Sequence, residues 1–195
     1  MKVYTKTGDK GITSLYDGNK VYKNSIIFQT IGEIDELSSR IGFLCSTISD
    51  EERYLSKKLL LRKIQGMLQE INSNIATINP NRKGKLQEFE ESNVVELESV
   101  IDEMELVNPK LTKFILPGVT LSDSSCHLCR TQTRKVERML WELSNTSHII
   151  TTKKQLSIDN LLQPSIYRYV NRLSDFFFVF ARWLCCMNNV EEYFK

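Results

Sequence analysis

Apolar residues recur along most of the chain at steps of three and four, which is the spacing of an amphipathic α-helix. The pattern predicts five helices, over residues 32–49, 60–78, 94–104 and 121–144 and from Pro164 onward. Asn79-Pro80 and Asn108-Pro109 end the second and third helices, because a residue before proline avoids the α conformation. The positions predicted to be buried are Ile34, Leu37, Ile41, Leu44 and Ile48, then Leu60, Ile64, Met67, Ile71, Ile75 and Ile78, then Val94, Leu97, Ile101 and Met104, then Leu128, Val136, Met139, Leu140 and Leu143, and last Ile166, Val170, Leu173, Phe177, Phe180 and Leu184.

The segments between the predicted helices carry polar and turn-forming residues. Residues 80–91 are polar and are predicted to be a linker, and residues 145–163 are rich in Ser, Thr and β-branched residues and are predicted to be a long loop. Residues 1–30 contain glycines and hydroxyls and predict an arm rather than a helix. No strand pair is evident. We therefore expect one all-α domain over residues 1–195, a five-helix bundle with an N-terminal glycine-containing arm.

The composition narrows the classes of function. With 26 Lys and Arg against 24 Asp and Glu, the net charge of +2 gives no basic field for nucleic acid or an anionic membrane. The apolar stretch at residues 176–181 is far shorter than the roughly 20 residues of a membrane-spanning helix, which favours a soluble protein. Five cysteines, an odd number, indicate reduced thiols. We expect a cytoplasmic protein as the sequence stands, or a mitochondrial matrix protein if a transit peptide was removed.

The arm contains one candidate for binding phosphate. Residues 5–14 combine glycines, which let the backbone approach a ligand, with lysines and hydroxyls that suit phosphate oxygens. The spacing is not that of a Walker A loop. A solvated, turn-rich terminus is the alternative interpretation.

The fourth helix contains a second candidate. Arg130, Arg134 and Arg138 are spaced at i, i+4 and i+8, so three guanidinium groups project along one stripe. Their mutual repulsion would be relieved by a polyphosphate, which arginine binds through a planar fork of donors. A solvated charged face is again the alternative. In the fifth helix, Asn171 could contact a base or a ribose.

The segment Cys126-His127-Leu128-Cys129 has two cysteines at a zinc-ligand spacing. The other close pair, Cys185-Cys186, is adjacent on a helix and points in two directions. A zinc site is therefore not favoured.

Five blocks follow one another along the chain: YTKTGDKGITSL at residues 4–15, GEIDELSSRIGF at 32–43, KFILPG at 113–118, CRTQTRKVER at 129–138 and YVNRLSDFFFVFAR at 169–182. In this order they resemble the blocks of the PduO-type cobalamin adenosyltransferases. The resemblance implies a homotrimer of five-helix bundles with active sites between subunits. It implies transfer of the 5′-deoxyadenosyl group of ATP, with Mg²⁺, to the cobalt of cob(I)alamin, which yields adenosylcobalamin and triphosphate. A reductase and an adenosylcobalamin-dependent enzyme would be its partners.

The resemblance also assigns roles to residues. The ATP-binding positions that it implies are Thr5, Lys6, Thr7, Gly8, Thr13, Ser14 and Lys23 in the arm, and Arg134, Lys135, Glu137, Arg138 and Asn171 in the helices. Arg130, Arg134, Glu137 and Phe114 would be catalytic. Asp35 and Arg130 would form an ion pair between subunits. Phe114 would face cobalamin and displace its lower axial base, while the metal ligands stay unassigned.

Three positions depart from the family pattern. Val119 stands where the family has the second glycine of PGG, and a turn that needs a positive φ there would be strained. Lys135 replaces an arginine and loses one bidentate fork, and Ser38 replaces an asparagine. A non-catalytic carrier or sensor of ATP or adenosylcobalamin, with the same fold, is therefore the alternative function.

Overall fold

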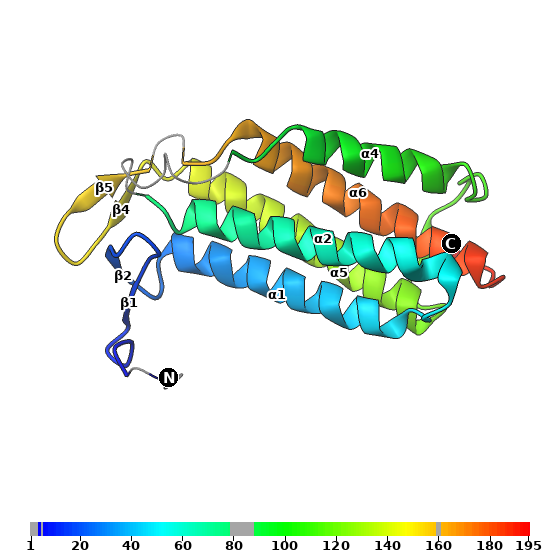
Figure 1. Ribbon diagram of the computed structural model, residues 1–195, viewed down its shortest axis with the longest axis horizontal. Coiled ribbons are helices and arrows are strands. Elements are labelled where there is room, and N and C mark those ends of the chain that lie inside the picture. The colour runs from blue at the N-terminus through cyan, green and yellow to red at the C-terminus, as the bar shows by residue number, and fades with distance from the viewer. Residues whose placement is uncertain (1–3, 5, 79–87, 159–160) are drawn as a thin grey trace.

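The computed structural model describes residues 4, 6–78, 88–158 and 161–195. Within these ranges the chain forms five helices, which run along the long axis of the molecule (Figure 1). The helices are α1 (Ile26–Thr47), α2 (Glu52–Ile75), α4 (Ser92–Glu105), α5 (Leu121–Ser144) and α6 (Pro164–Met187). The expected all-α bundle is confirmed, and α1 begins inside the segment assigned to the arm.

Local sequence explains where two of the helices begin. Thr120 and Asp123 form a capping box at the start of α5, in which each side chain bonds the backbone N–H of the other residue. Pro164 occupies the first turn of α6, where its fixed φ suits the helix and its missing N–H costs nothing. Both starts were predicted from the sequence.

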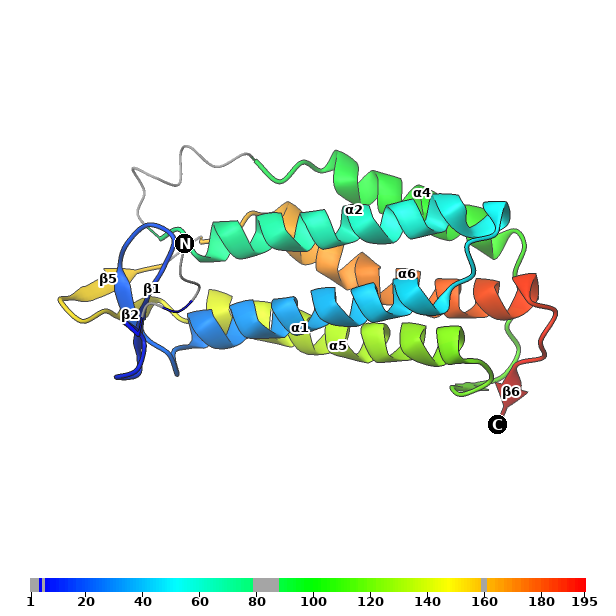
Figure 2. The same cartoon turned by 60° about the horizontal axis from the view of Figure 1, so that its bottom comes forward.

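The core lies between α1, α5 and α6, with α2 packed on α1 and α4 packed on α6 (Figure 2). The apolar seam of α6 is buried as predicted, and the rings of Phe176, Phe180 and Trp183 stack along it. Four of the positions predicted to be buried are only partly buried, namely Leu60, Met67, Ile101 and Met139, and the prediction for Leu128 is wrong, since this residue is half exposed. The buried stripe of α5 instead runs through Cys126, Cys129 and Thr133, one position out of phase with Leu128.

The described residues also contain short strands, which the sequence analysis missed. Three antiparallel pairs form: β1 (Ile12–Ser14) with β2 (Lys20–Tyr22), β3 (Ile115–Leu116) with β6 (Tyr193–Phe194), and β4 (His148–Ile150) with β5 (Gln155–Ser157). Each strand has only two or three residues, too few to produce a visible alternation of apolar and polar positions. The predicted loop at residues 145–163 therefore contains a hairpin.

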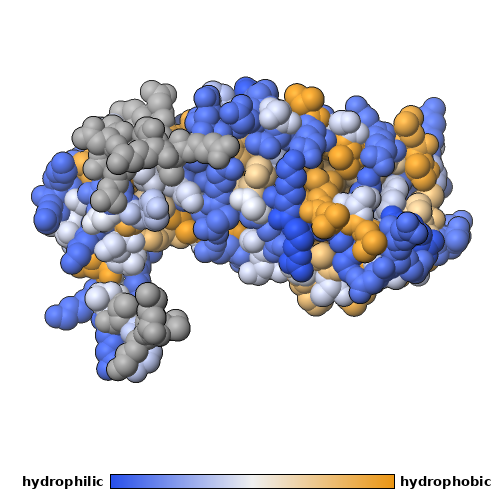
Figure 3. Space-filling view, in the orientation of Figure 1, coloured by the Kyte–Doolittle hydropathy of each residue, from blue (hydrophilic) through white to orange (hydrophobic). Residues whose placement is uncertain are grey.

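Two further features concern the surface and the linker. On the face that Figure 3 shows, hydrophobic residues gather mainly over the end of the bundle where α2 begins and α4 ends. Residues 80–87 of the predicted linker lie outside the described residues, but Phe89 is buried against Tyr169. No helix of the described chain is both long and apolar enough to span a membrane.

Candidate active site

The arm folds into a compact loop and the β1–β2 hairpin. Gly11, with φ +75°, donates its N–H to the carbonyl of Gly8, and Lys23 N–H bonds the carbonyl of Gly11. A Cβ atom on Gly8 would lie 3.0 Å from Nζ of Lys23, so the glycine lets this ammonium lie against the loop backbone. The structure thus brings two predicted phosphate-binding residues together.

The other arm residues are less enclosed. Lys6 and Thr7 are exposed, Thr13 is half-buried in β1, and Ser14 is exposed at its end. Thr5 lies outside the described residues. Lysine and hydroxyl groups of this arm therefore remain accessible to a ligand.

Two neighbouring elements hold the arm. Val21 of β2 is fully buried and pairs with Thr151, and the N–H of Thr152 donates to the carbonyl of Lys20 at 3.0 Å. Asp17 accepts a hydrogen bond from the N–H of Ile78, just beyond α2. The arm is therefore fixed to the end of the bundle where α5 ends, next to the β4–β5 hairpin (Figure 1).

The arginine row lies on α5. Arg134 and Arg138 are exposed, and within the described part of the chain no carboxylate forms an ion pair with either. Arg130 is partly buried, and its Nε has no hydrogen-bond partner among the described residues. Burial lowers the pKa of Arg130, and the positive charge of Arg134 lowers it further. No described carboxylate therefore forms an ion pair with any of the three guanidinium groups, which is the arrangement that an anion site requires.

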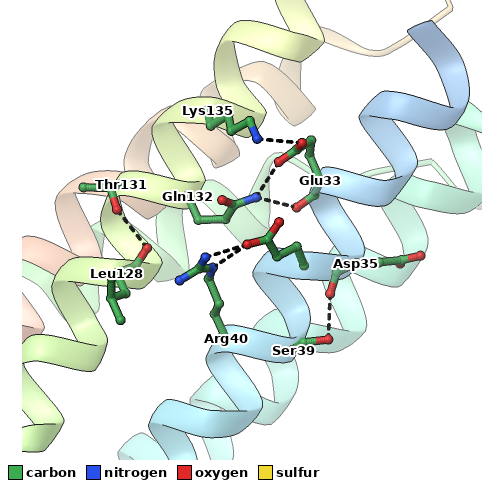
Figure 4. A network of polar contacts seen from close by, with 9 residues as sticks. Glu33, Asp35, Ser39, Arg40, Leu128, Thr131, Gln132 and Lys135 are labelled. Carbon is green, nitrogen blue, oxygen red and sulfur yellow. Dashed lines mark hydrogen bonds and ion pairs between the residues drawn. The ribbon is translucent and has the colours of Figure 1, made fainter. Parts of the chain in front are cut away.

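Lys135 points toward α1. Its Nζ lies 2.7 Å from Oε1 of Glu33, and Gln132 donates to Oε2 of the same carboxylate at 2.8 Å (Figure 4). The hydrogen bond from Lys135 is the main cause that holds the pKa of Glu33 below its usual value. The predicted ATP-binding role of Lys135 thus competes with an internal ion pair that the sequence analysis missed.

Asp35 does not contact Arg130 in the same chain. Its side chain points away from α5 (Figure 4), and Oδ1 accepts a hydrogen bond from Asn72 of α2 at 2.7 Å. The expected pairing of Asp35 with Arg130 was between subunits, so a single chain leaves it untested.

Asn171 of α6 meets Glu137 of α5. The Asn171 amide donates to the Glu137 carboxylate at 2.9 Å and accepts from Arg172 at 2.9 Å, while Arg172 also bonds Glu98 of α4. These bonds fix the orientation of the amide. Asn171 and Glu137 line a hollow of about 310 Å³, whose other lining residues are Trp141, Pro164, Tyr167 and Arg168. No pattern in the sequence indicates this hollow, because it forms only where residues of α5 and α6 meet.

Phe114 lies at the opposite end of the bundle, just before β3. Its side chain is 85% exposed, and its carbonyl accepts a hydrogen bond from the N–H of Lys195 at 3.0 Å. The β3–β6 pairing continues this contact, so the C-terminal residues fix the backbone that carries the ring. The ring is therefore exposed on a backbone that strand pairing fixes.

The neighbouring turn resolves one departure from the family pattern. The positive φ, +120°, falls on Gly118, whereas Val119 has no positive φ. The N–H groups of Gly118 and Val119 both donate to Asp123. Valine therefore fits this turn without the backbone strain that the sequence suggested.

The Cys126-Cys129 segment is part of the core. All five cysteines are free, and burial raises the pKa of the Cys129 thiol to about 12. The described residues hold no group of three or more His, Cys, Asp or Glu side chains that could bind a metal ion.

Known proteins match the chain over almost its whole length. The family model described as cobalamin adenosyltransferase matches residues 3–184. Corrinoid adenosyltransferase MMAB of Bos taurus is 35% identical over 100% of this chain and 76% of its own length. The corrinoid adenosyltransferase of Bacillus subtilis is 37% identical over 93% of this chain and 86% of its own length.

A solved structure matches the fold. It is a variant PduO-type ATP:corrinoid adenosyltransferase from Lactobacillus reuteri complexed with cobalamin and ATP, and it aligns with a TM-score of 0.86 and 31% identity over 100% of this chain and 99% of that one. The fold and the sequence thus define an α-helical adenosyltransferase. The chain belongs to the cobalamin adenosyltransferase family.

Proposed function

We propose that this chain is an ATP:corrinoid adenosyltransferase that transfers the 5′-deoxyadenosyl group of ATP to the cobalt of cob(I)alamin. The electron pair of Co(I) forms the new Co–C bond at C5′ of the ribose. The C5′–O bond breaks, and its electron pair leaves with the triphosphate. The cobalt is itself the nucleophile, so the protein contributes positioning and charge stabilisation.

The arginine row on α5 is the observation that carries this proposal. Arg134 and Arg138 bind the triphosphate, and Arg130, whose buried Nε lacks a partner, completes the row. The charge that gathers on the leaving group is stabilised by donors already in place. Lys23, held against Gly8, supports the arm as a second source of positive charge, together with Lys6, Thr7, Thr13 and Ser14.

Glu137 and Asn171 act on the nucleoside. The Asn171 amide is fixed by its bonds to Glu137 and Arg172, so it is oriented before ATP arrives. Magnesium enters with its substrate, as MgATP. Lys135 contributes to ATP binding only when its Nζ leaves the Glu33 carboxylate, so its contribution is smaller than that of Arg134.

Phe114 acts on the corrinoid. An axial ligand raises the energy of the cobalt orbital that accepts the electron, so removal of that ligand makes reduction to Co(I) easier. An exposed apolar ring on a fixed backbone is suited to occupy the lower face and exclude both the axial base and water. Phe114 is therefore assigned to the reduction step rather than to ATP binding.

The active form is a homotrimer with its sites between subunits. Half-exposed Phe43 and Leu128 line a groove of about 330 Å³ between α1 and α5, and such apolar exposure suits a subunit contact. In the trimer the carboxylate of Asp35 pairs with Arg130 of a neighbour and satisfies its Nε, so that Arg130 orients the row while Arg134 and Arg138 hold the triphosphate. A reductase and an adenosylcobalamin-dependent enzyme are its partners in the cytoplasm, or in the mitochondrial matrix if a transit peptide is removed.

The alternative, a non-catalytic carrier or sensor, is less favoured. It depended on Val119 and Lys135, and Val119 occupies an unstrained position. A lysine in place of arginine at position 135 would by itself lower the affinity for ATP. It would not remove the nucleophile, the arginine row or the arm.

The test is the spectral conversion of chemically reduced cobalamin to its adenosyl form with MgATP. We expect the wild-type chain to convert it, and Arg134→Ala to lower both ATP binding and conversion about 100-fold, because a charge-assisted contact to phosphate is lost. Arg62→Ala is the matched control, because Arg62 is an exposed arginine that bonds Gln65 within α2. Tight ATP binding by the wild type without conversion would support the carrier, and absence of ATP binding would contradict both functions.

A further inference from the structure

The β1–β2 and β4–β5 hairpins, which meet at the arm end of the bundle (Figure 1), enclose a cleft of about 210 Å³. One wall is the turn of the β1–β2 hairpin with the start of β2, residues 18–20, and the other is the turn of the β4–β5 hairpin, residues 151–154. Among the described residues that line it, none lies on a helix. This hairpin cleft is therefore separate from the arginine row of α5 and from the hollow beside Asn171.

Three lysines line the hairpin cleft, and within the described chain none of them forms an ion pair. They are Lys20, Lys153 and Lys154, and all three are exposed. The carboxylate in the β1–β2 turn, that of Asp17, accepts a backbone N–H group on each of its two oxygens. Three like charges around one cleft repel one another, and a bound anion would remove that repulsion.

The walls of the hairpin cleft are held in place by hydrogen bonds. The Thr151 side chain, in a residue only 7% exposed, accepts the N–H groups of Lys153 and Lys154 at 3.2 and 3.0 Å. It also donates to the carbonyl of Lys154 at 2.6 Å. The N–H of Thr152 donates to the carbonyl of Lys20 at 3.0 Å and so joins the two walls. Because the backbone is fixed, binding a ligand needs to order only the lysine side chains.

The chemistry of the hairpin cleft suits a small phosphate anion. Ammonium groups bind phosphate oxygens as point charges, without the fixed geometry of a guanidinium fork. Since lysines stand on both walls, an anion with several charged oxygens can contact both walls at once. Pockets for drug-sized ligands typically enclose about 300–1,000 Å³, so a cleft of about 210 Å³ favours an inorganic anion over a whole nucleotide.

We propose that the hairpin cleft is a second anion site, which binds inorganic phosphate in free or condensed form. The arm contributes Lys20, and the β4–β5 hairpin contributes Lys153 and Lys154. Three positive charges favour condensed phosphate over orthophosphate. The bound anion joins the arm to the hairpin by charge, in addition to the backbone bond between Thr152 and Lys20. The site does not depend on the proposed function, because its lysines take no part in the transfer.

The test measures binding of tripolyphosphate and of orthophosphate to the full chain by calorimetry, at constant ionic strength. Arg134→Ala/Arg138→Ala serves as the background, because it removes the arginine row, and both side chains are exposed, so the variant should fold. We expect this background to bind one tripolyphosphate, and to bind orthophosphate about tenfold more weakly.

Two further substitutions in this background give the size of the effect. Lys153→Gln/Lys154→Gln should raise the dissociation constant for tripolyphosphate about tenfold, because two of the three charges are lost. The matched control is Lys110→Gln/Lys113→Gln, which removes two exposed lysine charges near Phe114, at the opposite end of the bundle. It should change the dissociation constant less than about twofold, since exposed charges farther away than a Debye length are screened.

Hydrogen exchange locates the anion. In the background, tripolyphosphate should slow exchange of the N–H groups of residues 18–20 and 151–154, because the two turns are joined more firmly. This protection should be absent after Lys153→Gln/Lys154→Gln.

Three results would overturn the inference. If the background bound no tripolyphosphate, the hairpin cleft would not be an anion site. If the two lysine pairs weakened binding equally, the anion would respond to net charge rather than to the cleft. If protection appeared on α5 and not on the two turns, the anion would bind outside the cleft. None of these results touches the proposed function, which is judged by conversion of cobalamin in the wild-type chain.

Discussion

The two ends of the bundle are built in different ways. At the end where α5 finishes, the arm, the β4–β5 hairpin and the hollow beside Asn171 present lysines, hydroxyls and oriented amides. At the end where α5 begins, Phe114 carries a highly exposed ring just before β3, and β3 pairs with the C-terminal strand β6, which lies at this end (Figure 2). Between Leu121 and Arg138 the helix advances about 25 Å, so the proposed transfer from ATP to cobalt requires the two ends to meet between neighbouring protomers of the trimer rather than within one chain.

The difference matches the demands of the two proposed ligands. ATP is polyanionic and needs many polar contacts, so affinity at the arm end is spread over several side chains. For the corrinoid, the axial ligand must be kept away from the cobalt. One apolar ring on a fixed backbone is sufficient to do this. Variants at one end should therefore change ATP binding, and variants at the other should change reduction of cob(II)alamin.

Replacement of Phe114 should give the largest effect. Phe114→Ala is expected to lower turnover that starts from cob(II)alamin about 100-fold, because water or the axial base can return to the metal. The affinity for ATP should change less than twofold, and thermal stability should not fall, because the ring is exposed.

The control for this prediction is Leu106→Ala, which shortens another highly exposed apolar side chain at the end of α4. It should leave turnover unchanged. Equal losses of turnover and of ATP affinity in Phe114→Ala would contradict the separation of the two ends.

The second prediction concerns the support of Phe114. Arg182 and Glu192 form an ion pair with side chains only 4% and 9% exposed, and Arg182 also donates to the carbonyl of Pro109 at 2.7 Å. Glu192→Ala should lower the free energy of unfolding by about 3–5 kcal/mol, because it leaves a buried charge unpaired. Turnover from cob(II)alamin should fall as the C-terminal strand loosens, with ATP affinity retained.

Glu96→Ala is the matched control, because it breaks an ion pair with Lys63 in which both side chains are about half exposed. Denaturant unfolding should show a change of about 1 kcal/mol or less for this variant. If the two variants lost similar stability, the buried pair would not be what fixes the C-terminal end.

The third prediction tests the support of the arm. Val21→Ala removes two buried methyl groups from the contact between β2 and the β4–β5 hairpin, at a cost of about 1–2 kcal/mol. A less ordered arm should raise the dissociation constant for MgATP about threefold, because only the ordered fraction binds.

Tyr22→Ala provides the comparison, since Tyr22 is the next residue of the strand and points to the opposite, exposed face. It should change ATP affinity less than Val21→Ala does. Reduction of cob(II)alamin should be the same in both variants, and a loss there would show that the ends are coupled.

The sequence predicted the long helices well and the site only in part. The seam of α6, from Ile166 to Leu184, was fully predicted, because six apolar residues at steps of three and four leave no other face to bury. The prediction that Leu128 is buried was wrong because cysteines and a threonine continue the buried stripe of α5. These residue types are less hydrophobic than leucine, so the pattern did not reveal them. The exposure of Leu128 is also what a subunit contact would require.

Contacts between distant residues could not be predicted from one sequence. Asp35 bonds Asn72, Glu33 bonds Lys135, and Trp141 stacks on Tyr167, each across two helices. Helical spacing identifies which residues share a face, but not which faces meet or in what register. The arginine row was predictable because all three members lie on one helix.

The smallest expected effect is a pH dependence at the Phe114 end. His127 of α5 is buried against Phe178, and its Nδ1 has no hydrogen-bond partner within the described chain. Burial holds the pKa of His127 below 6.5, the charge of Arg130 lowers it further, and Asp123 and Glu192 act in the opposite direction.

Because the unfolded chain binds this proton more readily than the folded one, stability rises with pH between the folded pKa of His127 and 6.5. The free energy of unfolding should therefore fall as the pH drops from about 8 to about 5, and His127→Phe should make that fall shallower. Removal of the exposed His148 by His148→Gln should leave the slope as in the wild type. A slope unchanged in His127→Phe would place the acid sensitivity in other groups, and a steeper fall in Glu192→Ala would show that the Arg182–Glu192 pair also sets the protonation of this histidine.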